Sequence, residues 1–283
     1  MPNPFRLKVV FAAFIAFLVC QPTIAQQREV FQRQDDVIYF TALSKTSPTQ
    51  VYFITLLAYA LRKSEEEYGA FELQDYPIPM DQARQIETVK SGEADVLWTM
   101  ATPEREALLL PVKFPLLKGL LGKRVFLVTA EKEHAFKFDS LAELQQRKAI
   151  QGQSWPDTKI LQRNGFNVSA VSWYEWQFGV SKLLLNGQVD YFPRSVVEAK
   201  AELGLPYNKG LAIEAHHLLE YPAFIYFFVA PSKPELHQRL LKGLQKGQED
   251  GTFEEMLSSY PGYQSAQSIL RQPRKRHTLI NEP

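Results

Sequence analysis

The chain has 283 residues, of which 45% are hydrophobic, 22% charged and 12% aromatic. These fractions are ordinary for a globular protein and exclude a disordered or collagen-like chain, and a single cysteine, Cys20, excludes a disulfide framework. Lys plus Arg total 32 against 31 for Asp plus Glu, so the net charge of +1 lacks the basic excess typical of nucleic-acid binding. The length allows one large domain or two modest lobes.

The N-terminus has the pattern of a secretory signal peptide. Arg6 and Lys8 precede an apolar run, 9–20, that is too short to span a bilayer, and small residues follow near Ala25. We expect residues 1–25 to be removed and the mature protein to be periplasmic. Lipidation of Cys20 is the alternative, although the large side chains before it do not match a lipoprotein signal. Loss of Cys20 would leave a mature chain without a thiol, which suits an oxidising compartment.

Apolar runs and helix signals alternate along the rest of the chain. Ser47, Pro48 and Gln50 predict a capping box, followed by a helical stripe that begins at Val51. Further helices are predicted at 80–90, from 102, from 140, and at 156–164, 173–185, 196–203, 234–249 and 253–259. Strands are predicted at 37–41, 94–100, 124–129, 148–151, 168–171, 189–192, 211–213 and 223–230.

This alternation predicts an α/β protein with two doubly wound lobes of parallel strands, joined by a two-stranded hinge. The first lobe would comprise residues 26–128 and 222–270, and the second residues 129–221. The chain would cross between lobes near Thr129 and near Tyr221. Residues 271–283 are predicted to form a basic, solvated tail. A cleft between two hinged lobes is a natural ligand site.

The motifs of common enzymes and metal sites are missing from the sequence. It contains no GxSxG, HExxH, P-loop, GxGxxG or EF-hand pattern. His216 and His217 are adjacent, and neighbours on a strand face opposite sides, so they are poorly placed to share a metal. We therefore expect no cofactor and no metal. The remaining candidates for chemistry are acidic residues in the predicted cleft, namely Glu175, Glu214, Asp157 and Glu198.

Four segments in order resemble the periplasmic solute-binding proteins that serve polar amino-acid ABC transporters. They are SGEADVLW with TPERE and PVKFPL (91–116), the Gly152–Ser154 turn, LNGQVD (185–190) and the helix ending in DGTF (250–253). The resemblance covers nearly the whole mature chain and identifies it as a divergent member. It implies a type II binding-protein fold and a ligand between the lobes.

The resemblance implies specific ligand-binding residues in the first lobe. Arg105 matches the arginine that pairs with the ligand carboxylate, since a guanidinium presents a bidentate fork. The alternative is a surface arginine paired with Glu104 or Glu106. Thr102 lies beside it, Met100 and Trp98 replace smaller or hydroxyl residues of the family, and Thr41 lies near the cleft mouth because the family's covering loop is short here.

In the second lobe, the resemblance implies that Gln153 and Ser154 close onto the ligand, with Trp155 either against it or packed at the helix start. The family's ammonium-binding aspartate falls on Ser195, beside Arg194. A second arginine favours an anionic ligand. The alternative is a salt bridge from Arg194 to Glu198, four residues on.

We therefore expect a monomeric, hinge-closing periplasmic protein that binds a small carboxylate-bearing solute, anionic or amino-acid-like, and delivers it to an ABC permease. The first alternative is a solute-sensing subunit of a membrane signalling protein. The second is a lyase-type enzyme on the same fold. We expect neither nucleic acid nor a membrane-spanning segment in the mature chain.

Overall fold

The computed structural model contains two mixed β-sheets, each with its own helices. It describes residues 34, 37–43 and 47–281, except for the side chains of residues 173–178. The signal peptide, Cys20 and the proposed cleavage after Ala25 lie outside the described residues. The first sheet has the spatial order β2 (Glu72–Asp75), β1 (Val37–Phe40), β3 (Val96–Met100), β11 (Ile225–Val229) and β4 (Leu110–Val112).

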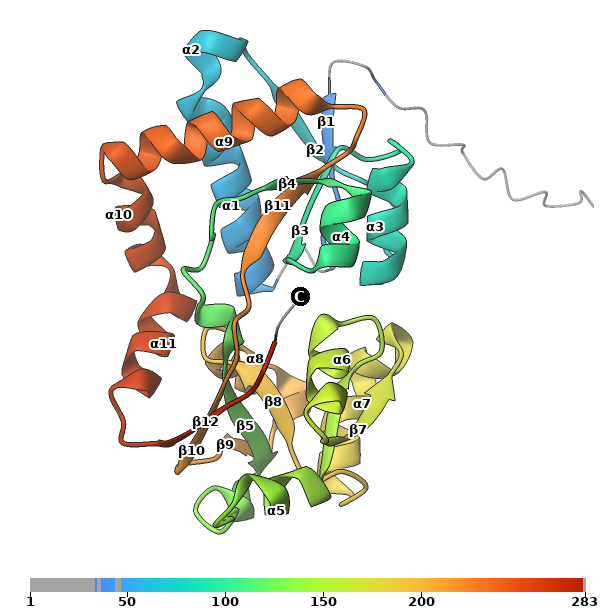
Figure 1. Ribbon diagram of the computed structural model, residues 1–283, viewed down its shortest axis with the longest axis vertical. Helices are drawn as coiled ribbons and strands as arrows, with labels where there is room; N and C mark the ends of the chain where they lie inside the picture. Colours follow the sequence, from blue (N-terminus) through green and yellow to red (C-terminus); the bar gives the residue numbers. More distant parts are fainter. Residues whose placement is uncertain (1–33, 35–36, 44–46, 282–283) are drawn as a thin grey trace, which may run out of the picture. The chain divides into compact units, whose positions relative to one another are not determined.

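The second sheet follows β5 (Lys123–Thr129). Its spatial order is β12 (Lys275–Thr278), β10 (His217–Glu220), β5 and β8 (Phe192–Ser195), with β9 (Leu211–Ile213) also paired to β5. The parallel pair β6 (Lys148–Gly152) and β7 (Asn167–Val171) continues it through a bridge between Ala149 and Tyr191. Figure 1 shows the first sheet in the upper part of the view and the second in the lower part.

The first sheet is covered by helices from both halves of the sequence. They are α1 (Pro48–Lys63), α2 (Glu65–Tyr68), α3 (Gln82–Lys90), α4 (Pro103–Leu108), α9 (Pro234–Glu249) and α10 (Thr252–Ser259). The face of α1 that is buried against α9 and the sheet carries Tyr52, Phe53, Leu56, Leu57 and Leu61. Of the predicted stripe, Val51 is exposed, whereas Leu61 is buried and Ile54 packs against the core.

The helices of the second lobe come from the middle of the sequence. They are α5 (Leu141–Gln146), α6 (Pro156–Arg163), α7 (Trp173–Leu185) and α8 (Ala199–Leu203), and α11 (Pro261–Leu270) lies between α1 and α8. Single 3-10 turns occur at Leu120–Gly122, Ala130–Lys132 and Pro206–Asn208. The two-lobed α/β architecture expected from the sequence is thus confirmed.

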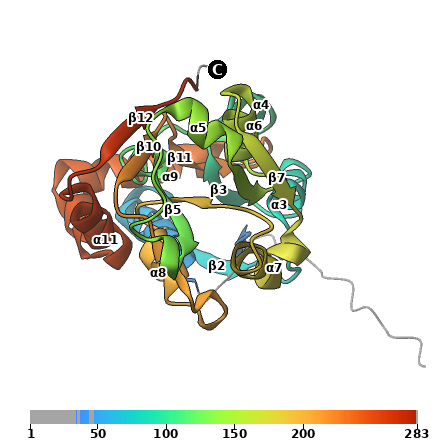
Figure 2. The same ribbon diagram turned by 90° about the horizontal axis from the view of Figure 1, so that it is seen from below.

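The strand directions differ from the predicted all-parallel sheets. β11 runs antiparallel to both β3 and β4, and β5 runs antiparallel to β8, β9 and β10. Parallel neighbours require a crossover connection, usually a helix. The chain enters β5 and β11 directly from the other lobe, so no such crossover precedes them. The predicted basic tail is also partly sheet, since β12 pairs in parallel with β10 (Figure 2).

The chain passes between the sheets at three places. It leaves the first sheet in residues 113–122, before β5 rather than near Thr129, and returns at 221–224, close to the predicted Tyr221. These two segments touch, because a Cβ on Gly122 would lie 1.9 Å from the Tyr221 carbonyl oxygen. The third connection, through α9, α10 and α11 to β12, was not predicted (Figure 1). The lobe boundaries 26–128 with 222–270, and 129–221, stay a prediction.

Candidate functional site

A hollow lies between the residues of the first sheet and those of the second. It encloses about 650 Å³ of non-atom space, part of it open to solvent. The first lobe contributes residues from α1, α3 and β3, and the second contributes residues from β5, β8 and the start of α6. The residues that line it are Leu43, Thr49, Gln50, Phe53, Gln82, Gln85, Trp98, Thr99, Met100, Leu117, Leu121, Arg124, Trp155, Pro156, Asp157, Arg194, Glu198 and Ile225.

Trp98 on β3 forms much of the apolar wall in the first lobe. Its ring packs against Phe40 and Phe53 at centroid distances of 5.9 and 5.7 Å, and its Nε1 donates to Gln50 Oε1 at 3.0 Å. This bond explains why the predicted capping box fails. Pro48 opens α1 as expected, but the Gln50 side chain binds the indole instead of the helix end.

Arg105 is buried at the start of α4, with 7% of its surface exposed. Thr102 caps this helix by accepting from Arg105 N at 3.3 Å, at the helix start that the sequence predicts. The guanidinium bends back to β3, where Nη1 donates to Thr99 Oγ1 and to the Met100 carbonyl oxygen. Burial lowers its pKa to about 10, opposed by the charges of Asp157 and Glu104. Arg105 therefore stays charged at neutral pH, and it is not the surface residue of the alternative interpretation.

The wall of the second lobe begins at the turn between β6 and α6. Pro156 occupies the first helical position, and the Trp155 ring lies against Gly152, where a Cβ would come within 2.7 Å of Trp155 Cδ2. Glycine is required here because of that close approach. The turn presents Trp155, Pro156 and Asp157 to the hollow.

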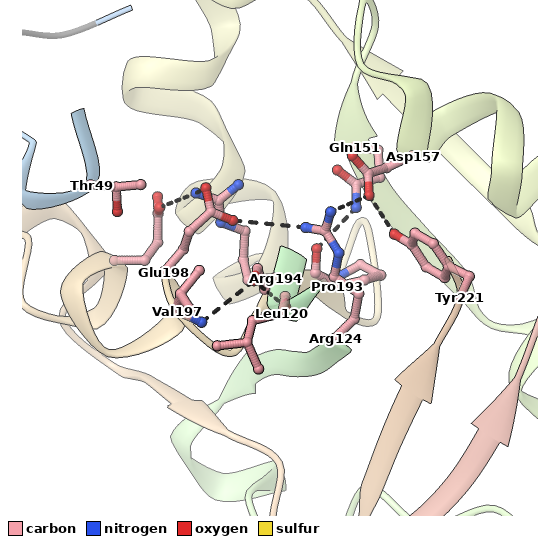
Figure 3. Close-up of polar contacts among 12 residues, drawn as sticks. Thr49, Leu120, Arg124, Gln151, Asp157, Pro193, Arg194, Val197, Glu198 and Tyr221 are labelled. Carbon is pink, nitrogen blue, oxygen red and sulfur yellow. Dashed lines mark hydrogen bonds and ion pairs between the residues drawn. The ribbon is translucent and has the colours of Figure 1, made fainter. Parts of the chain in front are cut away.

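Arg124 and Asp157 form a buried ion pair in this wall (Figure 3). Arg124 Nη2 lies 2.5 Å from Asp157 Oδ1, and the Tyr221 hydroxyl donates to the same carboxylate oxygen. Burial opposes the charge of Arg124, but Asp157, Tyr221 and Glu198 outweigh it and raise the pKa of the guanidinium above its usual value. Burial also raises the pKa of Tyr221, which therefore remains a hydrogen-bond donor throughout the ordinary pH range.

Arg194 on β8 is held by two carboxylates and two rings. Its Nη2 lies 3.2 Å from Glu198 and 3.0 Å from Glu202, and its guanidinium lies 5.2 Å from the ring centroids of both Trp155 and Phe192. The predicted alternative, an ion pair with Glu198, is confirmed. The pair spans a strand and the turn that follows it rather than successive turns of a helix.

Among the buried polar atoms of the lining residues, three on Gln85, Arg124 and Glu198 have no hydrogen-bond partner among the described residues. They are the donors Gln85 Nε2 and Arg124 Nε, and the acceptor Glu198 Oε2, which lies 3.8 Å from Arg124 Nη1. Gln85 and Arg124 are only 3% and 2% exposed. Buried polar groups are nearly always paired, so these atoms are candidate positions for hydrogen bonds to a bound molecule.

The structure brings together some of the predicted site residues and separates others. Trp98, Met100, Trp155 and Arg194 line the main hollow, whereas Gln153 and Ser154 line a smaller one next to it, together with Gln82 and Trp155. The other four predicted residues, Arg105, Thr102, Thr41 and Ser195, are absent from the lining of both hollows.

Ser195 and Thr41 are instead part of the interior. Ser195 Oγ donates to the Leu120 carbonyl oxygen at 3.1 Å, next to the crossing segment. Thr41 is 4% exposed, and its backbone N–H extends the first sheet by donating to Val96 O.

Sequence patterns pointed neither to Arg124 and Gln85 as lining residues nor to the pairing of Asp157 with Arg124. Asp157 and Glu198 had been named only as cleft carboxylates, and both line the hollow. Of the other two candidates, Glu214 is fully buried and accepts from the backbone N–H groups of His216 and His217, and the side chain of Glu175 is not described. One sequence feature could have drawn attention to Arg124, because it stands at the start of the apolar run RVFLV (124–128). A charged residue in a buried strand is rarely left unpaired.

Within the described part of the chain, no cluster of three or more His, Cys, Asp or Glu residues is arranged to hold a metal ion. In the same part, no helix combines the length and the hydropathy that crossing a membrane requires.

Comparison with known proteins identifies the fold of this chain. No family model and no curated protein matches the sequence. Among solved structures, the chain is similar to an ancestral arginine-binding protein bound to arginine, with a TM-score of 0.62 and 18% identity over 81% of this chain and 100% of the other. It is also similar to the periplasmic domain of B. pertussis BvgS, with a TM-score of 0.61 and 18% identity over 80% of this chain and 43% of that one.

A third similar structure is the ancestral amino acid-binding protein AncCDT-1, described as a precursor of cyclohexadienyl dehydratase. Its TM-score is 0.58, with 14% identity over 79% of this chain and 94% of the other. The chain thus has the two-lobed fold of periplasmic amino-acid-binding proteins. The fold implied by the sequence resemblance is confirmed, and the low identity agrees with a divergent sequence.

Proposed function

We propose that this protein binds a small, carboxylate-bearing solute in the hollow between its two lobes and presents it to a membrane partner in the periplasm. The observation that carries the proposal is the lining of this hollow. It is built from both lobes, and it contains buried N–H donors, on Gln85 and Arg124, without a partner among the described residues. A solute with acceptor oxygens would satisfy both donors and hold the lobes together.

The lining of the hollow suits a small organic molecule. Ligand pockets commonly combine apolar walls with a few placed polar groups. Here Trp98, Met100 and Trp155 supply the apolar walls. An ancestral protein of the same fold is described as bound to arginine, and another structure of it as bound to glutamine. Both molecules carry a carboxylate, which supports this class of solute.

The test is the identity of the molecule that accompanies the purified mature protein. Mass spectrometry of the denatured protein should release one carboxylate-bearing compound in stoichiometric amount. That compound, added back, should raise the midpoint of thermal unfolding, because a ligand bound only by the folded state stabilises it. Failure of every small carboxylate to bind in isothermal titration would overturn the proposal. The mass of the mature chain also tests removal of residues 1–25.

Delivery to an ABC permease is the first candidate role. The similarity to the periplasmic domain of BvgS favours a second role, in which the protein reports solute to a membrane signalling protein. Solute-dependent crosslinking in intact cells separates the two. A permease subunit recovered with the protein supports uptake, and a signalling protein supports sensing.

The enzyme alternative rests on Asp157 and Glu198, two carboxylates that line one hollow, and on the similarity to a dehydratase precursor. Each carboxylate is paired with an arginine, as expected for structural ion pairs. Proton NMR of the protein with its solute tests this alternative. Stable solute signals over many hours support binding without turnover.

A further inference from the structure

We infer that Arg124 of the second lobe, rather than Arg105, receives the anionic group of the bound solute. This assignment rests on the proposed function, because it names the residue of the same hollow that would recognise the carboxylate.

Arg105 has little hydrogen-bonding capacity left for a solute. A guanidinium carries five N–H donors. Its Nη1 donates to Thr99 Oγ1 at 2.5 Å and to Met100 O at 3.1 Å, and its Nη2 donates to Gln82 Oε1 at 2.6 Å and to Ser154 O at 3.2 Å. Four of the five donors are therefore occupied by protein acceptors. A solute carboxylate would have to displace several good bonds to reach this group.

Arg124 is equally buried and lines the hollow, but its donors are less fully used. Nη2 pairs with Asp157 at 2.5 Å, whereas Nη1 lies 3.8 Å from Glu198 Oε2, and Nε has no hydrogen-bond partner among the described residues. The Nε–H and an Nη1–H of a guanidinium point to different sides, so one acceptor oxygen of a solute can reach Nε while another replaces the distant Glu198 contact at Nη1. Arg124 therefore has N–H donors available to a solute, whereas most of the donors of Arg105 already bind protein acceptors.

The acidic neighbours of Arg124 leave room for this exchange. Glu198 has a closer cation in Arg194, which lies 3.2 Å from its Oε1 and also contacts Glu202. The long contact between Glu198 and Arg124 is the weakest ion pair of the cluster (Figure 3). An incoming carboxylate would replace that contact, while Asp157 and Tyr221 continue to hold Arg124 in place.

Gln85 provides a donor from the other lobe. Its side chain is 3% exposed on α3, and its Nε2 has no hydrogen-bond partner among the described residues. An amide and a guanidinium from opposite walls would each donate to the acceptors of one solute. Binding would then connect α3 of the first lobe to β5 of the second.

The test uses isothermal titration of the mature protein with L-arginine, L-glutamine, L-aspartate, L-malate and succinate. For each probe that binds, the dissociation constant is measured for Arg124→Lys, Gln85→Met and Arg105→Lys. Arg239→Lys is the matched control, because Arg239 is also buried and donates to backbone carbonyls, away from the hollow.

We expect Arg124→Lys and Gln85→Met each to weaken binding by about tenfold to a hundredfold, the effect of losing a hydrogen bond to a charged group. The control should bind as the unaltered protein does. Circular dichroism confirms folding, and if Arg124→Lys does not fold, Gln85→Met decides alone. Tight binding by Gln85→Met, or a greater loss in Arg105→Lys than in Arg124→Lys, would overturn the inference but leave solute binding standing. Failure of all five probes with the unaltered protein would overturn both.

Discussion

Arg105 Nη2 donates to the carbonyl oxygen of Ser154 at 3.2 Å, so a side chain held by the first sheet bonds to the turn that opens α6 in the second lobe. The same nitrogen also donates to Gln82 Oε1 on α3. This arginine therefore joins three segments that are distant in the sequence. Its contacts make it a structural link between the lobes.

Replacing this link should cost stability. In Arg105→Met, the acceptors on Gln82, Thr99, Met100 and Ser154 lose their donor, and buried acceptors left unpaired are costly. We expect the free energy of unfolding in urea to fall by about 2–4 kcal/mol. Arg62→Met is the control, since Arg62 is exposed and surface substitutions change stability by about 0.5 kcal/mol or less. Equal stability of the two variants would contradict a linking role.

The ion pair between Arg194 and Glu202 should be strongly coupled. Their side chains are 9% and 14% exposed and lie 3.0 Å apart. A double-mutant cycle with Arg194→Met and Glu202→Gln should give a coupling free energy of about 1–2 kcal/mol, within the range for contacting residues. The exposed pair Lys90 and Glu87 at 3.2 Å should give less than about 0.5 kcal/mol. Coupling no greater than in this surface pair would show that Arg194 is held mainly by its rings.

Stability should depend on pH through His277 in β12. Burial lowers the pKa of this imidazole below 6.5, helped by His217 and Lys275 and opposed by Glu214. Its ring lies 5.0 Å from that of Phe138, and its Nε2 has no hydrogen-bond partner among the described residues. Below about pH 6.5 the unfolded chain binds a proton that the folded chain resists, so stability is full above this pH and falls as the pH drops towards the folded-state pKa.

The measurement is urea unfolding between pH 5 and 8. In His277→Phe the loss of stability below about pH 6.5 should be smaller, with a difference in slope of at most about 1.4 kcal/mol per pH unit for one proton. His134→Phe is the control, because the side chain of His134 is 75% exposed. An identical pH profile for His277→Phe and the unaltered protein would refute the prediction.

Packing between α1 and α9 should make Gly243 harder to replace than Gly247. A Cβ on Gly243 would lie 1.9 Å from the carbonyl oxygen of Ala60, which is backbone and cannot move alone. A Cβ on Gly247 would lie 1.9 Å from the Tyr59 hydroxyl, at the end of a side chain that can rotate.

We expect Gly243→Ala to lower the free energy of unfolding by about 1–3 kcal/mol, the usual cost of overpacking. Gly247→Ala should cost less, about 0.5–1.5 kcal/mol, from loss of the hydrogen bond between Tyr59 and Thr252. Both values come from chemical denaturation. A reversed order would show that the helices separate more easily than the close approach of their backbones suggests.

Helix boundaries were the most predictable part of this protein, because the signals that set them are local. Pro103, Pro156 and Pro234 open α4, α6 and α9 as expected, and Ser140 caps α5 by accepting from Glu143 N. A cap or a first-turn proline acts within four residues, so the sequence alone determined these positions. The α/β class and the division into two lobes followed from the alternation of such elements.

Tertiary structure alone decided the strand directions, the third connection and the composition of the site. Arg124 and Asp157, which form an ion pair, are 33 positions apart in the sequence. Gln85 lies in a helical segment that contains no recognisable ligand-binding motif. That Arg105 pairs with a ligand carboxylate stays a prediction; in the structure its Nη2 donates to Gln82 and Ser154, which come from other segments of the chain. Whether a charged side chain is free to bind a ligand depends on which distant acceptors reach it, and spacing along the chain does not carry that information.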